Sequence, residues 1–216
     1  AQENRAGAKS LQKDVEAVFE SVQVESKYKG RIITATGPIQ QDAQPLLHYV
    51  ETIHAWSAPG LFAWDRLDKG SALLLDHMPD LYGDVADFGC GWGALSRAIL
   101  KQNAVETLTA IDADALAIAA IDKNITDPRF TSQWRDATES INKTFDAILM
   151  NPPFHEGGKA DRHDLGAAMI DNAMAHLKPG GRLTLVANAH LPYEKNLPAY
   201  QSLIEQDGFK ILTCII

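Results

Sequence analysis

The sequence predicts an α/β fold in which helices cover both faces of a mostly parallel sheet and an antiparallel hairpin ends the chain. Three observations predict it. From Asp84 onward, short apolar runs that suit buried strands alternate with segments of helical period. A glycine-rich turn, Gly89 to Gly93, joins the first strand to the first helix. Near the end, Asp207-Gly208 lies between two strand-like runs, which is a strong hairpin signal.

The elements follow in the order strand, helix, strand, helix, strand, strand, helix and strand, ahead of the hairpin. Each strand is an apolar run, and each helix has apolar residues that recur every three or four positions. A Lys-Pro-Gly-Gly turn, Lys178 to Gly181, precedes the last of these strands. We expect strands at 85–88, 107–112, 130–134, 145–150 and 182–187, helices at 94–101, 115–124 and 165–176, and hairpin strands at 202–206 and 209–213.

Residues 1–58 are interpreted as an N-terminal extension with a connector, and residues 59–216 as the main domain. Apolar residues recur at helical spacing from Leu11 to Val22, and strand-like runs flank a Lys29-Gly30 turn. Two readings stay open: the tail of a preceding duplicated domain, or an extension that packs on the same sheet. A short helix is expected at 71–77, ahead of the first strand of the main domain.

Composition limits the class of protein. The 216 residues, 45% of them hydrophobic, suffice for one sizeable α/β domain with a small appendage. Two cysteines, Cys90 and Cys214, give neither a disulfide framework nor a zinc pattern, so we expect the reducing cytoplasm and no metal. No apolar run approaches the roughly 18 residues of a membrane span. The net charge of −8 argues against a broad phosphate-binding surface, so any contact with RNA must be local or shared with another domain.

The glycine loop indicates a nucleotide-like ligand. Gly89-Cys90-Gly91-Trp92-Gly93-Ala94 satisfies the G-x-G-x-x-G/A pattern after a strand, and Asp112 ends the next strand where a ribose-binding acid is expected. The pattern fits a dinucleotide or S-adenosylmethionine. Asp87 favours the second, because a carboxylate at the mouth of the loop repels a pyrophosphate but suits the ammonium of a methionine moiety. A tight turn without any ligand is the plainer alternative for the three glycines.

Two more acidic positions extend this ligand site. Asp112, followed by Ala113, is expected to accept both ribose hydroxyls, and Asp136, followed by Ala137, to face the adenine amino group and ring edge. Either aspartate could instead cap a helix, although Asp114 is the better cap for the helix that begins at 115.

Asn151-Pro152-Pro153-Phe154 follows an apolar strand and indicates chemistry at an amino group. The lone pair of an exocyclic amino group is delocalised, and two carbonyls that accept its N–H bonds oppose that delocalisation. Asn151 and the Pro152 carbonyl suit this role, because successive prolines hold the backbone extended. Phe154 offers a flat face on which a planar substrate can stack, and the plainer alternative is a core phenylalanine.

Together, Asp87-x-Gly89-x-Gly91-x-Gly93, Asp112, Asp136 and Asn151 to Phe154 resemble a Rossmann-like class I S-adenosylmethionine-dependent methyltransferase that acts on an amino nitrogen. Further segments are similar to the bacterial ribosomal RNA guanine-N2 methyltransferases, especially the small-subunit methyltransferase C family. The resemblance covers about 59–216. The segments that carry it are Asn151 to Gly157, Pro59 to Phe62, Leu67 to Ser71 and Val186 to Tyr193.

The resemblance implies a catalytic domain that methylates guanine N2 in 16S ribosomal RNA, with ribosomal RNA or the small subunit as partner and a degenerate N-terminal domain that helps to bind RNA. Phe62, Phe154, His155 and Lys159 are the expected substrate contacts. Trp64 and Trp92 stand where smaller or more variable residues are expected.

Other functions stay open at this point. Enzymes that methylate adenine N6 or a glutamine amide share the Asn-Pro-Pro-aromatic motif and its mechanism. An NAD-dependent oxidoreductase would fit the glycine loop but not the residues from Asn151 onward, and a non-catalytic RNA-binding module would not need both motifs intact.

Overall fold

The computed structural model describes residues 2–3, 8–27, 30–37, 47–153 and 163–216. The chain forms two compact units, Ala1–Leu46 and Leu47–Ile216, and each is treated by itself. Within the described residues, no helix is long and apolar enough to cross a membrane.

The first unit is a small sheet with one helix. Its elements are β1 (Gln2–Glu3), α1 (Ala8–Val18), β2 (Ser21–Lys27) and β3 (Gly30–Thr36), and the strand order is β1-β3-β2. The β2 and β3 strands pair antiparallel from Ser21↔Thr36 to Lys27↔Gly30, so the expected hairpin is present.

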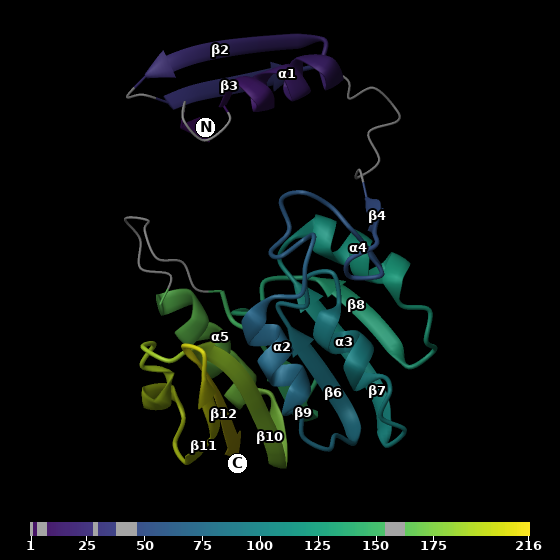
Figure 1. The fold of residues 1–216 in the computed structure, drawn as a ribbon, viewed down its shortest axis with the longest axis vertical. Coiled ribbons are helices and arrows are strands. Elements are labelled where there is room, and N and C mark those ends of the chain that lie inside the picture. The colour runs from purple at the N-terminus through teal and green to yellow at the C-terminus, as the bar shows by residue number, and fades with distance from the viewer. Residues whose placement is uncertain (1, 4–7, 28–29, 38–46, 154–162) are drawn as a thin grey trace. The chain divides into compact units, whose positions relative to one another are not determined.

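The second unit is built on a seven-stranded sheet of order β11-β12-β10-β9-β6-β7-β8 (Figure 1). The five strands from β10 to β8 are parallel, whereas β12 is antiparallel to both β10 and β11. The fold prediction is therefore confirmed. The strands are β6 (Gly83–Phe88), β7 (Val105–Asp112), β8 (Phe130–Trp134), β9 (Phe145–Met150), β10 (Leu177–Asn188), β11 (Tyr200–Gln206) and β12 (Phe209–Ile215).

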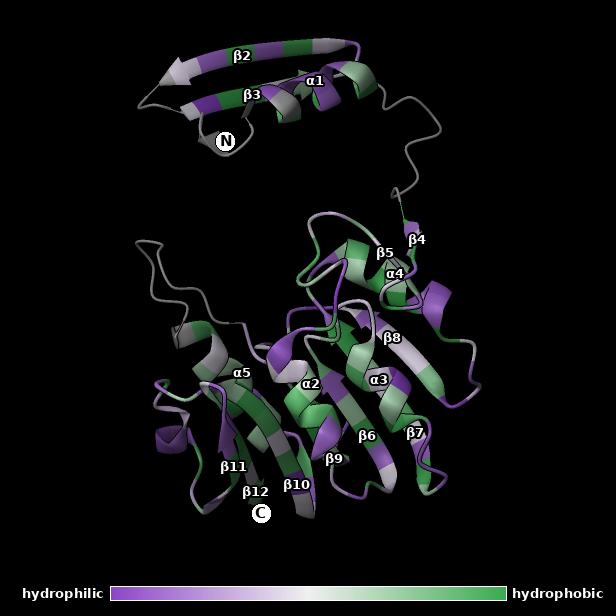
Figure 2. Cartoon of the chain, viewed as in Figure 1, coloured by the Kyte–Doolittle hydropathy of each residue, from purple (hydrophilic) through white to green (hydrophobic). Residues whose placement is uncertain are grey.

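Helices cover both faces of this sheet, because successive side chains of each central strand point to opposite faces. In β9, Ile148 and Met150 join a core that α5 (His163–Ala175) covers. Ala147 and Leu149 join a second core, which α2 (Lys69–Asp76) and α3 (Ala94–Ile99) cover. The central strands are correspondingly rich in hydrophobic residues (Figure 2). The remaining helices are α4 (Ala115–Asn124) and the 3₁₀ turn η1 (Tyr193–Asn196).

The strand and helix predictions hold apart from local shifts. Asp207 and Gly208 both have positive φ, 52° and 80°, as the expected tight hairpin requires. The prediction that Lys178 to Gly181 form a turn before the strand is wrong. These residues lie within β10, where its pairing with β9 shifts register. Backbone bonds from Gly180 N to Ile216 O and from Ile216 N to Gly181 O join this segment to the residue that follows β12.

An arm of residues 47–67 begins the second unit. It carries β4 (His48–Val50) and β5 (Ala55–Ser57), which pair antiparallel. The side chain of Asn124, the last residue of α4, accepts from Trp56 N at 2.6 Å and donates to Trp56 O at 2.8 Å. The same amide nitrogen donates to Trp92 O at 2.9 Å. Residues 47–58, which the sequence assigns to the N-terminal extension, therefore pack in the same unit as the sheet.

Candidate active site

The site follows from the strand order. Chain connections run from β6 outward to β7 and β8 on one side and from β9 outward to β10 on the other, so the order reverses between β6 and β9. Ligands of open α/β sheets bind outside the carboxyl ends of the strands at such a point. Asp87 lies near the end of β6 and Asn151 directly follows β9. The topology thus places the donor-loop and amino-group motifs beside each other.

A cavity of about 560 Å³ lies at this edge of the sheet, within the volume range of small-molecule sites. A smaller cavity of about 50 Å³ adjoins it, and Phe62, Gly89, Gly91 and Asn151 line both. The larger cavity is otherwise lined by Gly60, Leu61, Asp112, Ala113, Asp114, Ala117, Asp136, Ala137, Pro153, Leu165 and Met169. The structure therefore brings residues from every predicted donor-binding segment to one place.

Asp87 is the most unusual charge in the site. Its side chain is 1% exposed and lines the smaller cavity. Ser96 Oγ donates to its Oδ2 at 2.6 Å, but Oδ1 is buried and has no hydrogen-bond partner in the described part of the chain. Burial, opposed by the Ser96 hydrogen bond and assisted by the nearby charge of Asp112, raises the pKa of Asp87 to about 7. A buried acceptor without a partner is suited to a cationic ligand group.

Asp112 holds the loop and keeps capacity for a ligand. Its Oδ2 accepts from Gly91 N and its Oδ1 from Asp114 N, each at 2.9 Å. A carboxylate oxygen has a second lone pair, so each can also accept a hydroxyl. Burial is the main cause that raises the pKa of Asp112. Asp114 itself caps α4 by accepting from Leu116 N at 2.8 Å, which confirms the expected cap.

Asp136 and Ala137 follow β8 and line the larger cavity. Asp136 also closes a local turn, because its Oδ1 accepts from both Thr138 N, at 2.9 Å, and Thr138 Oγ1, at 2.8 Å. Both bonds use one oxygen, so Oδ2 stays able to face a ligand. Ala113 lines the same cavity.

The three glycines of the loop meet different surroundings. Gly91, at φ +53°, has nothing within 4 Å of the place where a Cβ would stand and lines the cavity. Gly89, at φ +75°, would meet Met169 at 3.5 Å. Gly93 instead faces α4, where a Cβ would come 2.8 Å from Ile121, and it lines neither cavity. Close packing against α4 and a left-handed backbone, with φ +96°, thus account for Gly93.

Asn151 is held by the N-cap residue of α2 and by one residue of that helix. Its Nδ2 donates to Asp68 Oδ2 at 3.1 Å and to Ser71 Oγ at 2.9 Å. The carbonyl oxygen of the side chain is not used in either bond. Pro152 is buried, and Pro153 lines the larger cavity together with Phe62, which is 54% exposed. Phe154, His155 and Lys159 lie outside the described residues.

Asp68 and Ser71 were not predicted as site residues. Aspartate before a helix is a recognisable N-cap, and the structure shows Asp68 in that role, with Oδ2 accepting from Ser71 N at 3.1 Å. The helix therefore begins two residues before the predicted start. The sequence could not show that the cap faces Asn151, since the two positions are 83 residues apart.

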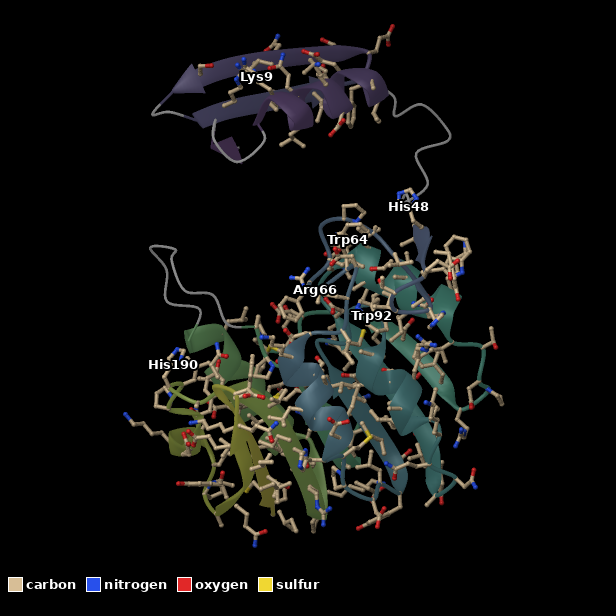
Figure 3. All side chains as sticks on the ribbon, viewed as in Figure 1. Lys9, His48, Trp64, Arg66, Trp92 and His190 are labelled. Carbon is tan, nitrogen blue, oxygen red and sulfur yellow. The ribbon has the colours of Figure 1, made fainter. Side chains whose placement is uncertain are left out.

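Trp92 anchors the arm above the loop. It is 7% exposed, packs with Ile53 and Leu61, and its indole Nε1 donates to Ala63 O at 3.2 Å (Figure 3). Trp64 packs against the same cluster. The two tryptophans therefore hold in place the segment that carries Phe62. In the described part of the chain, no group of three or more His, Cys, Asp and Glu side chains could hold a metal ion.

Comparison with curated proteins finds relatives that are longer than this chain. Ribosomal RNA small subunit methyltransferase C of Pseudomonas paraeruginosa is 38% identical over 164 residues, which are 73% of this chain and 49% of that protein. The protein of the same name from Shewanella sediminis is 30% identical over 210 residues, 92% of this chain and 61% of that protein. The chain spans about half the length of most of the curated relatives it matches.

Solved structures show the same fold. A 16S rRNA N2 methyltransferase of T. thermophilus, in complex with AdoMet and guanosine, matches with a TM-score of 0.72 and 24% identity over 99% of this chain and 62% of that chain. A ribosomal protein L11 methylase from Lactobacillus delbrueckii subsp. bulgaricus matches with a TM-score of 0.57 and 20% identity, over 74% of this chain and 83% of that chain.

A family model described as the methyltransferase small domain matches residues 52–213, which include most of the arm, the glycine loop and Asn151. The chain therefore belongs to the methyltransferase small domain family.

Proposed function

We propose that this chain is the catalytic part of an S-adenosylmethionine-dependent enzyme that methylates an exocyclic amino nitrogen, guanine N2 of 16S ribosomal RNA. The observation that carries the proposal is the position of Asn151. It lines both the cavity that contains Asp112 and the cavity that contains Asp87, and within the described residues no hydrogen bond reaches its side-chain carbonyl. A methyl donor and an amino-group substrate would thus meet at this residue.

The residues at the cavity fit the methyl donor. Asp87 Oδ1, buried and without a partner in the described part of the chain, suits the ammonium of the methionine moiety. Gly89 and Gly91 let the backbone come close to that moiety. Asp112 is assigned to the ribose hydroxyls, and Ala113, Asp136 and Ala137 to the adenine ring and its amino group. Gly93 supports the loop from behind.

In this reaction the main task of the protein is to position the methyl donor and the substrate nitrogen. The donor supplies a methyl group on a sulfonium, which the lone pair of the substrate nitrogen attacks in line. Asn151 Oδ1 and the Pro152 carbonyl would accept the two amino N–H bonds, so that the lone pair is localised and aimed. The nitrogen is acidic once methylated and loses its proton to solvent, so no strong general base is required. Phe62 and Phe154 are assigned to the flat faces of the base, and His155 and Lys159 to its surroundings.

The RNA substrate is supported by the names of the relatives and by the length of the match. The chain covers 49% of the Pseudomonas paraeruginosa protein, and its net charge is −8. We therefore propose that a further domain supplies most of the RNA-binding surface, with residues 1–46 as the end of that domain. A cytoplasmic location belongs to the same proposal, since Cys90 and Cys214 are buried free thiols.

Mass-spectrometric mapping of 16S ribosomal RNA from cells that lack the gene tests this function. One N2-methylguanosine should disappear, and the full-length gene should restore it whereas an Asn151→Ala version should not. Loss of an N6-methyladenosine, or of a methylglutamine in digested release factors, would instead identify one of the other substrates of the same motif. Unchanged RNA and protein methylation would refute the proposal.

A further inference from the structure

An asparagine amide can act in two orientations. Its oxygen and nitrogen are similar in size, and a half-turn of the group exchanges a hydrogen-bond acceptor for a donor. Only one orientation serves the proposed reaction, because a substrate amino group must meet Oδ1 of Asn151 rather than another NH₂ group. Some neighbour must therefore select between them.

The contacts of Asn151 identify that neighbour. Both hydrogens of Nδ2 are used, one toward Asp68 Oδ2 at 3.1 Å and one toward Ser71 Oγ at 2.9 Å. Among the described residues, no hydrogen bond reaches Asn151 Oδ1. The acceptor end of the amide is thus left for a ligand, at a residue that lines both cavities.

Asp68 and Ser71 differ in what they permit. A carboxylate only accepts hydrogen bonds, so the opposite orientation would press Oδ1 of Asn151 against Oδ2 of Asp68, with no proton between them. The hydroxyl of Ser71 can donate or accept and would tolerate either orientation. Asp68 alone of the two selects the productive orientation.

The position of Asp68 is set by the fold. It is the N-cap of α2, with φ −64° and ψ 145°, and Oδ2 also accepts from Ser71 N. A Cβ on Gly70 would come 3.1 Å from that Oδ2 and 3.1 Å from the Phe209 ring. A glycine at this position therefore leaves room for the Asp68 carboxylate. Buried leucines of α2 hold the helix on the sheet. The carboxylate is therefore a fixed reference against which the amide is oriented.

We propose that Asp68 is a positioning residue for methyl transfer, which holds Asn151 with Oδ1 facing the substrate amino group. Its negative charge also polarises the amide, so that Oδ1 becomes a stronger acceptor. This inference rests on the proposed function. It predicts that Asp68 affects the rate of methyl transfer by orienting Asn151. Capping of α2 is a separate task of the same side chain.

Three variants separate the two tasks. Asp68→Ser keeps a good N-cap but is one atom too short to reach Asn151. Asp68→Asn keeps the cap and the acceptor that faces Asn151, because Ser71 N holds its oxygen in place, but it loses the charge and turns the other oxygen into an NH₂ group. Ser71→Ala is the matched control, since it removes the other partner of Asn151 but leaves Asp68 to select the orientation of the amide. Each is made in the full-length protein, with 16S ribosomal RNA from cells lacking the gene as substrate.

In single-turnover assays, Asp68→Ser should lower the transfer rate roughly 10²-fold, the cost of a misplaced catalytic group, with RNA affinity and thermal midpoint near wild type. Asp68→Asn and Ser71→Ala should each stay within about tenfold of wild type, a smaller loss than misorientation causes. In an Asn151→Ala background, Asp68→Ser should cause no further loss, because its effect passes through that amide.

The outcomes distinguish this inference from the function on which it rests. A near-wild-type rate in Asn151→Ala would overturn the assignment of Asn151 itself. If Asn151→Ala is inactive but Asp68→Ser transfers at the wild-type rate, only the role of Asp68 is refuted. A loss in Asp68→Ser that Asp68→Asn does not rescue would show that the charge of Asp68, rather than its orienting hydrogen bond, carries the effect, and would refute the positioning role. A loss that tracks a lowered thermal midpoint would reduce Asp68 to a structural cap.

Discussion

Gly91 N donates to Asp112 Oδ2 at 2.9 Å, so the glycine loop and the end of β7 are joined through protein atoms. The bond places the carboxylate at the end of β7 directly beside the glycine-rich turn that follows β6. The same carboxylate that shapes the loop is the one that we propose binds the ribose of the donor.

Replacement of Asp112 should weaken donor binding. Asp112→Ala removes an acceptor of two hydroxyl bonds, worth up to about 1.5–3 kcal/mol for each charge-assisted bond, and also releases Gly91 N. Asp112→Asn is a sharper probe, since both oxygens now accept from backbone N–H groups and an amide can satisfy only one. Titration calorimetry with S-adenosylmethionine measures both. Unchanged affinity in a folded variant would remove Asp112 from the site, and tight binding of NAD instead would overturn the donor assignment.

Donor affinity should depend on pH through Asp87. Burial raises the pKa of this carboxyl to about 7, so below that pH it is mostly protonated. A bound ammonium favours the carboxylate, so binding must release the proton and affinity should fall as the pH is lowered from 7.5 to 5.5. Calorimetry in two buffers of different ionisation enthalpy detects that proton. Asp87→Asn should bind weakly at every pH and lose the dependence, whereas a flat wild-type profile would show that Asp87 does not pair with the ammonium.

A charge network at the opposite edge of the sheet should control acid stability. Lys178 Nζ contacts both Asp84 Oδ2 and Asp146 Oδ2 at 2.8 Å. The bonds from Lys178 and Thr107 lower the pKa of Asp84 to about 2. A depressed carboxyl pKa stabilises the fold above the unfolded value near 4, and that stability is lost as the pH falls toward 2.

Asp84→Asn should therefore cost about 1–2 kcal/mol at pH 7, discounted because the side chain stays 29% exposed, and much less near pH 2.5. Urea unfolding at the two pH values measures this difference. Donor affinity at pH 7 serves as the control and should not change. A variant equally destabilised at both pH values would show that lost packing, rather than the ion pairs, causes the effect.

The sequence predicts the sheet well because strand identity here depends on local pattern. The segments at 115–124, 130–134 and 145–150 have the predicted bounds, since each is a short apolar or amphipathic run with clear ends. The Lys178 to Gly181 segment differs because pairing with Phe145 at one end and bonds to Ile216 at the other keep it in the sheet. That stabilisation is tertiary and leaves no trace in a turn-forming sequence.

The candidate site divides in the same way. Asp87, Asp112, Asp136 and Asn151 could be found because parallel strands deliver their carboxyl ends to one edge. The hydrogen-bond and packing partners of the site residues could not be predicted from the sequence. Asp68 reaches Asn151 across 83 positions, and the need for glycine at 93 comes from Ile121 of another helix. Such pairings depend on how helices pack, which the periodicity of one segment does not specify.

The contact between Asn151 and Asp68 predicts that a substitution at position 68 restores part of the transfer rate that a substitution at position 151 removes. Asn151→Asp replaces Nδ2 by an oxygen at a position 3.1 Å from Asp68 Oδ2. Two carboxylates at that distance cannot both be ionised in a partly buried site, so one takes up a proton or the side chain turns away. The transfer rate should fall by about 10²–10³, as when a preorganised hydrogen bond to the reacting group is lost.

Asp68→Asn in the same chain removes one of the two charges, so the new carboxylate at position 151 no longer faces a second carboxylate. The double variant Asp68→Asn/Asn151→Asp should therefore transfer methyl groups faster than Asn151→Asp alone, although Asp68→Asn by itself brings no gain over wild type. Single-turnover transfer from labelled donor to RNA measures all four proteins, with thermal midpoints to exclude unfolding. Equal rates for the single Asn151→Asp and the double variant would contradict the contact, because the repulsion that it predicts could not then be the cause of the loss.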